Sequence, residues 1–232
     1  MSTLAKPSTA GTISPRSLRD DIVQVLQHDI ITGVFQPGQR IVERELINRF
    51  GVSSIPVREA LQDLESRGLL TRKLNHGYSV VKLTYEEARR ICELRRLLEP
   101  KVVEWVTARI TPEGLSELER QLDEIELAAR EGDMASFFHA DLIFHRLLWN
   151  ASGNPYAAKA LDSAIGTLFA SGLARSERDA KAGTAVAIDR LAEVEKHRRM
   201  TAAIKAGDAQ LAALALLEIA AGFERHFQPN GE

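Results

Sequence analysis

The chain has 232 residues, of which 44% are hydrophobic and 27% are charged, a composition typical of globular proteins with one large or two modest domains. Its single cysteine, Cys92, excludes an internal disulfide and a cysteine-rich metal site, and fits a reducing compartment. The N-terminus has no apolar export segment, and the most apolar run, residues 211–223, is interrupted by Glu218 and is too short to span a bilayer. We therefore expect a soluble cytoplasmic protein without a membrane segment.

The net charge of −2 is unevenly distributed. Residues 1–82 carry eleven Lys and Arg against eight Asp and Glu, a net charge of +3, whereas the remainder carries −5. A basic part joined to an acidic part is expected when one module contacts phosphates and the other does not touch nucleic acid. The asymmetry is modest, so it supports this interpretation without establishing it.

Residues 1–15 are rich in Ser, Thr, Gly, Ala and Pro, which predicts a disordered tail. From Ser17 apolar residues recur every fourth position, the spacing of an amphipathic helix that Gly33 should end. A Pro-Gly turn follows, and residues 40–42 can add a short strand.

The next segment has the order of a helix-turn-helix. Residues 43–50 predict a short helix that Gly51 breaks, and Ser53 can cap a second helix that tolerates Pro56 in its first turn. Apolar residues of the second helix form an inward face, while a separate polar face is free to enter a groove of DNA and consists of Ser54, Arg58 and Gln62.

Two short β-prone runs follow, residues 69–73 and 78–83, separated by a turn signal at residues 74–77. A hairpin at this position is a wing. An ordinary pair of helices would not require it, so the hairpin favours a winged helix over a plain helical hairpin.

Over about seventy residues, from the Pro-Gly turn of GVFQPGQRI through ERE, VREAL and LESRGLL to the His-Gly turn, the chain resembles the winged helix of the GntR family of bacterial transcription regulators. The resemblance implies that one group of residues contacts DNA, with the wing tip in the minor groove: Arg44, Ser53, Ser54, Ile55, Arg58, His76 and Gly77. The family usually has Arg and Thr where this chain has Ser54 and Ile55, so its operator preference should differ from the common family site.

From Thr84 onward the periodicity is helical. Capping residues, glycines and prolines predict six helices in antiparallel bundle order, with a polar loop at 176–183: 84–110 with a kink at Pro100, 111–132, 133–152, 154–175, 185–206 and 208–227. The predicted fold class is mainly α, with a winged helix-turn-helix at residues 16–83 and an all-α antiparallel bundle at residues 84–232.

The bundle sequence is similar to the all-helical FCD domain of FadR-type GntR regulators, on the basis of LRRLLE, DLIFH, EKH and AIKAGD. This resemblance implies a homodimeric regulator in which the helical domain binds a small organic acid, often beside a metal, and sets the spacing of two winged helices on operator DNA.

Asp141 and His145 project from one helix in the same direction, and His197 on another helix can complete a metal site. An Asp and a His at this spacing are more often a solvated helix face, but apolar neighbours favour a position inside the bundle. The family pattern adds a further histidine where this chain has Ile219. The expected cofactor is therefore a weakly held divalent metal, zinc or similar, with open coordination positions.

Arg95 stands where the family pattern has an arginine, and its planar guanidinium group suits an effector carboxylate. An ordinary ion pair with Glu99, one turn further on, is an equally good interpretation. Trp105 and Trp149 can line a pocket or simply form core.

Together these features predict a transcription regulator that binds double-stranded operator DNA, most simply a repressor released by a small carboxylic-acid effector. A metal-dependent enzyme acting on a small organic acid is the alternative. It is disfavoured because the sequence offers no clear nucleophile or base and would leave the DNA-binding segment without a role.

Overall fold

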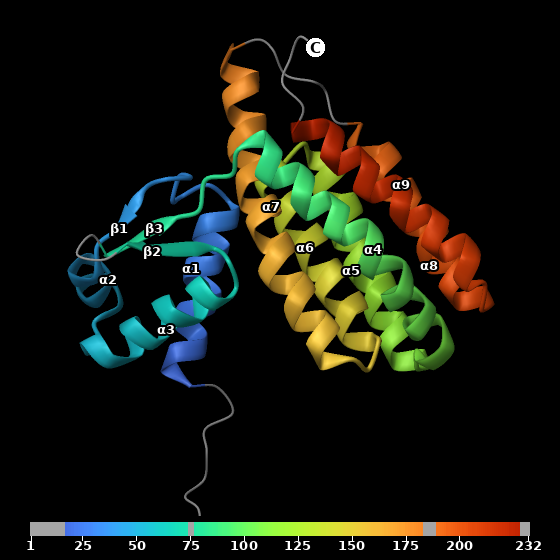
Figure 1. Ribbon diagram of the computed structural model, residues 1–232, viewed down its shortest axis with the longest axis horizontal. Coiled ribbons are helices and arrows are strands. Elements are labelled where there is room, and N and C mark those ends of the chain that lie inside the picture. Colours follow the sequence, from blue (N-terminus) through green and yellow to red (C-terminus); the bar gives the residue numbers. More distant parts are fainter. Residues whose placement is uncertain (1–16, 74–76, 183–188, 228–232) are drawn as a thin grey trace, which may run out of the picture.

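The computed structural model describes residues 17–73, 77–182 and 189–227, which form an N-terminal winged-helix domain packed against a helical bundle (Figure 1). The predicted tail at residues 1–15 and the wing residue His76 lie outside the described residues. No helix in the described ranges is long and apolar enough to cross a membrane.

The winged-helix domain has three helices and a three-stranded antiparallel sheet of order β1-β3-β2 among its described residues. In chain order its elements are α1 (Leu18–Ile31), β1 (Arg40–Ile41), α2 (Glu43–Phe50), α3 (Ser54–Ser66), β2 (Leu70–Lys73) and β3 (Gly77–Val80). The predicted short strand and the predicted wing hairpin are confirmed, although β3 ends at Val80 rather than at Leu83.

Local sequence signals explain most of these boundaries. Ser17 and Asp20 form a capping box at the start of α1. Gly51 ends α2 in the left-handed conformation with φ of +65°, which allows the sharp turn into α3. Ser53 occupies the N-cap position of α3 as predicted, but its side chain makes no capping hydrogen bond. The core of the domain contains Ile22, Leu26, Leu46, Val57, Leu61 and Leu64.

The described part of the bundle contains the six expected helices: α4 (Tyr85–Arg109), α5 (Pro112–Glu131), α6 (Met134–Ala151), α7 (Pro155–Ala182), α8 (Arg190–Ala206) and α9 (Ala209–Phe227). Two predicted boundaries were wrong. Residues 176–182 continue α7 instead of forming a loop, because their Ala, Arg, Glu and Lys residues are strong helix formers despite the lack of apolar spacing. Helix α8 begins at Arg190, with Asp189 as its N-cap, rather than at Ala185.

The predicted helix caps are present. The side chains of Thr84, Thr111, Asp133, Asn154 and Asp208 all accept backbone N–H hydrogen bonds at the starts of their helices. Each such cap stabilises a helix start by about 1 kcal/mol, which explains why the starts of these five helices could be predicted from the sequence.

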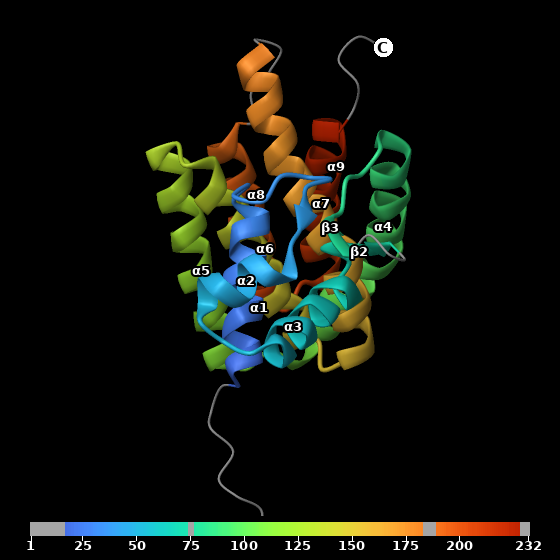
Figure 2. The same cartoon turned by 90° about the vertical axis from the view of Figure 1, so that its left-hand side faces the viewer.

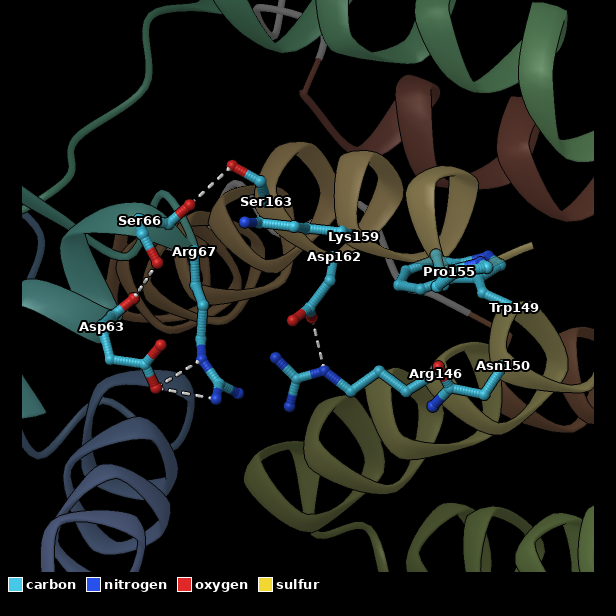
Figure 3. Close-up of a pocket in the computed structure, with 11 residues that line it drawn as sticks. Asp63, Ser66, Arg67, Arg146, Trp149, Asn150, Pro155, Lys159, Asp162 and Ser163 are labelled. Atoms are coloured by element: carbon cyan, nitrogen blue, oxygen red, sulfur yellow. Dashed lines mark hydrogen bonds and ion pairs between the residues drawn. The ribbon is translucent and has the colours of Figure 1, made fainter. Parts of the chain in front are cut away.

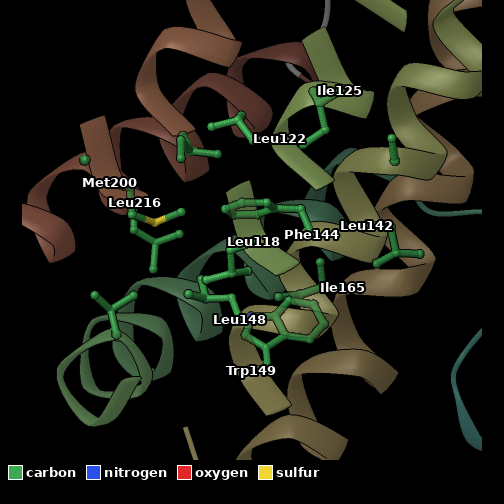
Figure 4. Close-up of a cluster of buried hydrophobic side chains, with 14 of the residues drawn as sticks. Leu118, Leu122, Ile125, Leu142, Phe144, Leu148, Trp149, Ile165, Met200 and Leu216 are labelled. Carbon is green, nitrogen blue, oxygen red and sulfur yellow. The ribbon is translucent and has the colours of Figure 1, made fainter. Parts of the chain in front are cut away.

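The bundle core is apolar and closely packed (Figure 4). Its largest fully buried side chains include Trp149, Phe138, Phe144, Phe169, Leu118 and Ile125. Burying each of them contributes roughly 1.5–3 kcal/mol. Trp149 is therefore a core residue, whereas Trp105 is only partly buried. Helices α8 and α9 lie on the side of the bundle away from the winged helix (Figures 1 and 2).

The C-terminal end of α3 is attached directly to α7. The Ser163 hydroxyl donates to the Ser66 carbonyl oxygen over 3.1 Å, and the Thr167 hydroxyl donates to the Gly68 carbonyl oxygen over 2.5 Å. Gly68 has φ of +73°, and a Cβ atom there would overlap the Ser163 carbonyl oxygen. This position therefore requires glycine both for its backbone conformation and for the close approach of α7. Part of this junction is drawn in Figure 3.

Candidate effector site and DNA-binding surface

The proposed DNA-contacting residues lie on α2, on α3 and at the wing. Figure 1 shows α2 and the beginning of α3 on the side of the domain away from the bundle. Arg44 on α2 is exposed, and Ile55 in the first turn of α3 is 66% exposed. Such an exposed apolar side chain on a reading helix suits contact with a thymine methyl group.

Arg58 projects from the same helix, and its Nε lies 2.7 Å from Oε1 of Glu43 at the start of α2. The Arg58 side chain is 62% exposed, and an exposed ion pair of this kind contributes little free energy. Arg58 is therefore able to leave its ion pair with Glu43 and donate hydrogen bonds to a base edge or a phosphate.

The remaining predicted contacts are distributed around this surface. Ser53 is exposed and Ser54 is half-buried at the start of α3. Gly77 is exposed at the start of β3 with φ of +76°, a conformation that favours glycine. These residues lie at the start of α3 and at the start of β3, the elements through which a winged helix contacts DNA.

The bundle brings three predicted metal ligands together in its interior. Oδ1 of Asp141 lies 3.0 Å from Nε2 of His197 and 3.5 Å from Nε2 of His145. One ligand atom from each residue lies within 4.8 Å of the other two, and all three residues are buried. Two residues from α6 and one from α8 thus form the cluster that was expected from the sequence.

The ligand atoms in this cluster have no hydrogen-bond partners. This is true of Oδ1 of Asp141 and Nε2 of both histidines, although the atoms are close to one another. Buried polar atoms are rarely left unsatisfied, because each one costs about 1–3 kcal/mol. Atoms this close together are able to serve as ligands of one ion.

The tautomer of His197 is fixed by its own helix. Nδ1 of His197 donates to the Glu193 carbonyl oxygen, one turn earlier on α8, over 2.8 Å. In the neutral ring this bond leaves the lone pair on Nε2, which faces Asp141, the arrangement that a metal-ligating histidine needs; in the protonated ring Nε2 carries a proton toward the carboxylate.

Burial and mutual charge determine the protonation of the cluster. Burial lowers the pKa of His145 to about 3, against the opposing effect of Asp141, so this imidazole is neutral. Burial alone would raise the pKa of Asp141 and lower that of His197, but the attraction between the two outweighs it: the pKa of Asp141 lies below its ordinary value and that of His197 lies above. The cluster therefore holds the Asp141 carboxylate beside a neutral His145 imidazole and a His197 imidazole whose protonated form is favoured.

Arg95 is fully buried beside the cluster and pairs with Glu99, whose Oε2 lies 3.0 Å from Nε of the arginine. The ion-pair interpretation of Arg95 is thus realised in this state. Its Nη1 has no hydrogen-bond partner, and its guanidinium carbon lies 5.7 Å from the centre of the Phe223 ring. One donor of the guanidinium group is consequently still available to an additional acceptor.

Ile219, on α9, is 3% exposed and lines a small cavity together with Asp141. The cavity has a volume of about 30 Å³ and is also bordered by Phe137, Phe138, Glu193, Gly222 and Phe223. The position that bears a histidine in the family pattern thus adjoins the cluster, as expected, but contributes a hydrocarbon side chain.

Sequence reasoning did not assign functional positions to Phe223 and Glu193. Phe223 lies against Arg95 and the cavity, and Glu193 orients His197 through its backbone carbonyl oxygen. The contact between His197 and Glu193 could have been predicted from their spacing of four residues on one helix.

The architecture therefore defines a DNA-binding module joined to a helical domain with a buried polar site. Comparison with known families agrees with both parts: residues 18–80 match the model "Bacterial regulatory proteins, gntR family", and residues 90–222 match the FCD domain. The chain belongs to the GntR family of bacterial regulatory proteins and carries an FCD domain.

Individual relatives support this assignment. The HTH-type transcriptional regulator YdhC of Bacillus subtilis is 37% identical over 138 residues, which cover 59% of this chain and 62% of that protein. The "Probable D-xylose utilization operon transcriptional repressor" of Paenarthrobacter nicotinovorans is 28% identical over 96% of this chain and 92% of its own length. The solved structure of Escherichia coli McbR/YncC has a TM-score of 0.75 at 25% identity, over 89% of this chain and 94% of that one.

The family and these relatives are transcription regulators, so the enzyme alternative is set aside.

The geometry of α3 predicts the effect of removing Arg58. In the Arg58→Ala variant, operator affinity should fall by about 1–3 kcal/mol and specificity should relax at one position in each half-site. Fluorescence anisotropy with the operator and with single-base variants of it measures both quantities. Arg120→Ala is the matched control, because Arg120 on α5 is similarly exposed, at 66%. Unchanged affinity and selectivity of Arg58→Ala would show that α3 does not read the bases through this residue.

Proposed function

We propose that this regulator binds operator DNA in the cytoplasm as a homodimeric repressor, and that a small carboxylic acid bound in the helical domain beside a divalent metal controls its affinity. The observation that carries the proposal is the buried cluster of Asp141, His145 and His197, whose ligand atoms lack hydrogen-bond partners.

The donor set fits a divalent metal. Zinc bonds to nitrogen and oxygen of about 2.0–2.2 Å place neighbouring ligand atoms of one ion roughly 3–3.5 Å apart. The measured separations of 3.0 Å and 3.5 Å agree with this requirement. Two imidazole nitrogens, with His197 giving up its proton on binding, and one carboxylate are ligands that zinc and related metals accept. When bound, the metal would supply an open position for a carboxylate oxygen.

Arg95 is positioned to hold the other part of the acid. Its Nη1 is buried and unpartnered, while Nε and Nη2 are oriented by Glu99. A guanidinium group held from one side by a carboxylate is pre-organised to donate to a second one.

Binding of an acid requires the bundle to move. The cavity beside Asp141, with a volume of about 30 Å³, is too small for an organic acid, because ligand pockets are typically some 300–1,000 Å³. Ile219 and Phe223 of α9 border this cavity, so the acid must displace them. Because α9 packs along α4 and is tied to it by the Arg96–Glu224 ion pair, displacement of α9 should reach α4.

Helix α4 is also the proposed dimer surface. Among the mostly charged exposed residues of this helix are two leucines, Leu94 at 38% and Leu97 at 76% exposure. Exposed apolar side chains that lie together are characteristic of protein interfaces. Four residues separate the end of β3 from the start of α4, so pairing through α4 would set the distance between the two winged helices. A dimer whose halves rotate would separate them from successive major grooves.

The central test uses small carboxylic acids with and without zinc. An acid that binds the bundle should raise the melting temperature, with a larger effect in the presence of zinc, and should weaken operator binding in the same concentration range. Arg95→Lys keeps the charge but loses the planar fork, so it should lose most of the acid response; Arg120→Lys, at an exposed position on α5, is the control. If no acid changes both melting and operator binding, the bundle is not an effector domain of this kind.

Ile219→His tests the metal. An imidazole at this position adds a ligand to an existing cluster, so metal content after dialysis should rise well above wild type and the melting temperature should climb with added zinc. His197→Ala in the same background should remove the gain. Elemental analysis of wild type and both variants decides the matter: equal, negligible metal in all three would rule out a metal site in this cluster.

Leu97→Glu tests the dimer. A charge at the centre of the α4 surface should shift the protein toward monomer and weaken operator binding, because two half-sites must be held together. Sedimentation velocity over a range of concentrations measures the association. Leu127→Glu is the control, since Leu127 is 52% exposed on α5. Equal association of the two variants would place the interface elsewhere.

A further inference from the structure

The junction between the two domains contains a polar cleft that the proposed function does not use. The cleft has a volume of about 430 Å³ and lies between the end of α3 and helices α6 and α7 (Figure 3). Its charged lining residues are Asp63, Arg67, Arg146, Lys159 and Asp162. A second cleft of about 610 Å³, between α1 and α6, is also lined by Arg67 and Arg146. The two arginines therefore form the wall that both clefts share.

Each of these arginines belongs to a different domain and pairs with a carboxylate of that domain, although Asp63 also pairs with Arg19. Arg67, at the end of α3, donates to Oδ2 of Asp63 through Nε at 3.0 Å and Nη2 at 2.8 Å. Arg146, on α6, donates through Nε to Oδ1 of Asp162 at 2.6 Å. Figure 3 shows the two guanidinium groups facing each other across the cleft. Like charges brought face to face repel, and an anion between them would relieve the repulsion.

Two buried donors on residues that line the cleft lack acceptors. Nη2 of Arg146 is buried without a hydrogen-bond partner, and the same is true of Nε1 of Trp149, which lines the cleft and is 1% exposed. Arg146 thus has donor capacity that its partner Asp162 does not fully satisfy.

We propose that the domain junction binds a phosphate group, inorganic or carried by a small phosphorylated metabolite, between Arg67 and Arg146. A tetrahedral phosphate presents oxygens in opposite directions, so two facing guanidinium groups can each donate to it, whereas the two oxygens of a carboxylate lie on one side of its carbon. Lys159, at the open side of the cleft, adds a third cation.

Such a ligand would join the domains. Arg67 moves with α3, and Arg146 moves with α6. A phosphate held by both would stabilise the docked position of the winged helix and would favour whichever dimer arrangement preserves that docking. This site is separate from the buried cluster, so it does not depend on the presence of a metal or an acid in the bundle.

Trp149 provides a local reporter for the test. In a Trp105→Phe background, Trp149 is the single tryptophan of the chain, and titration with inorganic phosphate at constant ionic strength should change its fluorescence to saturation while raising the melting temperature. Arg67→Gln should weaken phosphate binding at least tenfold, and Arg120→Gln should not change it. Because Arg146→Gln alone leaves Asp162 without its partner, Arg146→Gln with Asp162→Asn is the variant for the second arginine, with the same loss expected.

Three ligand series complete the experiment. Saturation by inorganic phosphate identifies the free ion as a ligand, and saturation only by glycerol phosphate or a sugar phosphate identifies a phosphorylated metabolite; either outcome supports the site if both arginine variants weaken it. Equal responses of wild type and the arginine variants would overturn the proposal, as would no saturable response to any phosphate. Saturation by acetate at a lower concentration than by phosphate would overturn the assignment to phosphate.

Discussion

The bundle depends on the compensation of a buried carboxylate. An ionised Asp in an apolar interior loses several kcal/mol of hydration unless nearby groups replace the water. Asp141 is compensated by His197 and His145, with Arg95 beyond them. Aromatic rings close the space around these groups: Phe144 lies against both histidines, and Trp149 stacks on His145. Removing His197 would leave the buried Asp141 carboxylate without its main partner, so these two residues tolerate change only together.

Helix α6 connects this interior to the domain junction. It places Asp141 and His145 inward, while Arg146 and Trp149 line the cleft at the end of α3. The rings of His145 and Trp149 have centroids 5.7 Å apart and an interplanar angle of 29°. A rotation of His145 toward an occupant of the cluster must therefore displace Trp149 or slide along it. The buried cluster and the surface that contacts the DNA-binding domain are formed by neighbouring residues of one helix. This helix provides a short physical route by which a change at the cluster could reach the domain junction.

Local signals predicted most of the fold, and tertiary contacts account for what they missed. Caps such as Thr84 and Asp133, and the turn glycine Gly51, act within a few residues, so the sequence reveals them. The pairing of Asp141 with His145 also follows from spacing on one helix, but His197 comes from a distant helix and was assigned through the family pattern. The clefts at the junction combine the end of α3 with residues of α6 and α7, and no linear motif marks such a meeting. Nor could spacing alone decide whether Arg95 meets Glu99 or a ligand; the structure shows the Glu99 pair together with a free donor.

The hydrogen bonds from α7 to Ser66 and Gly68 hold the C-terminal end of α3, so this end acts as a pivot when the winged helix tilts against the bundle. The thirteen residues of α3 extend about 20 Å from that pivot. A tilt of about 10° at α7 would move the far end by about 3.4 Å, which is the rise of one base pair along DNA. A displacement too small to disturb the bundle core would thus carry the first turn of α3 from one base step to the next. The large displacement at the start of α3 arises from the length of the helix and needs no large rearrangement. It would be lost if a bulkier residue at position 68 moved α3 away from α7.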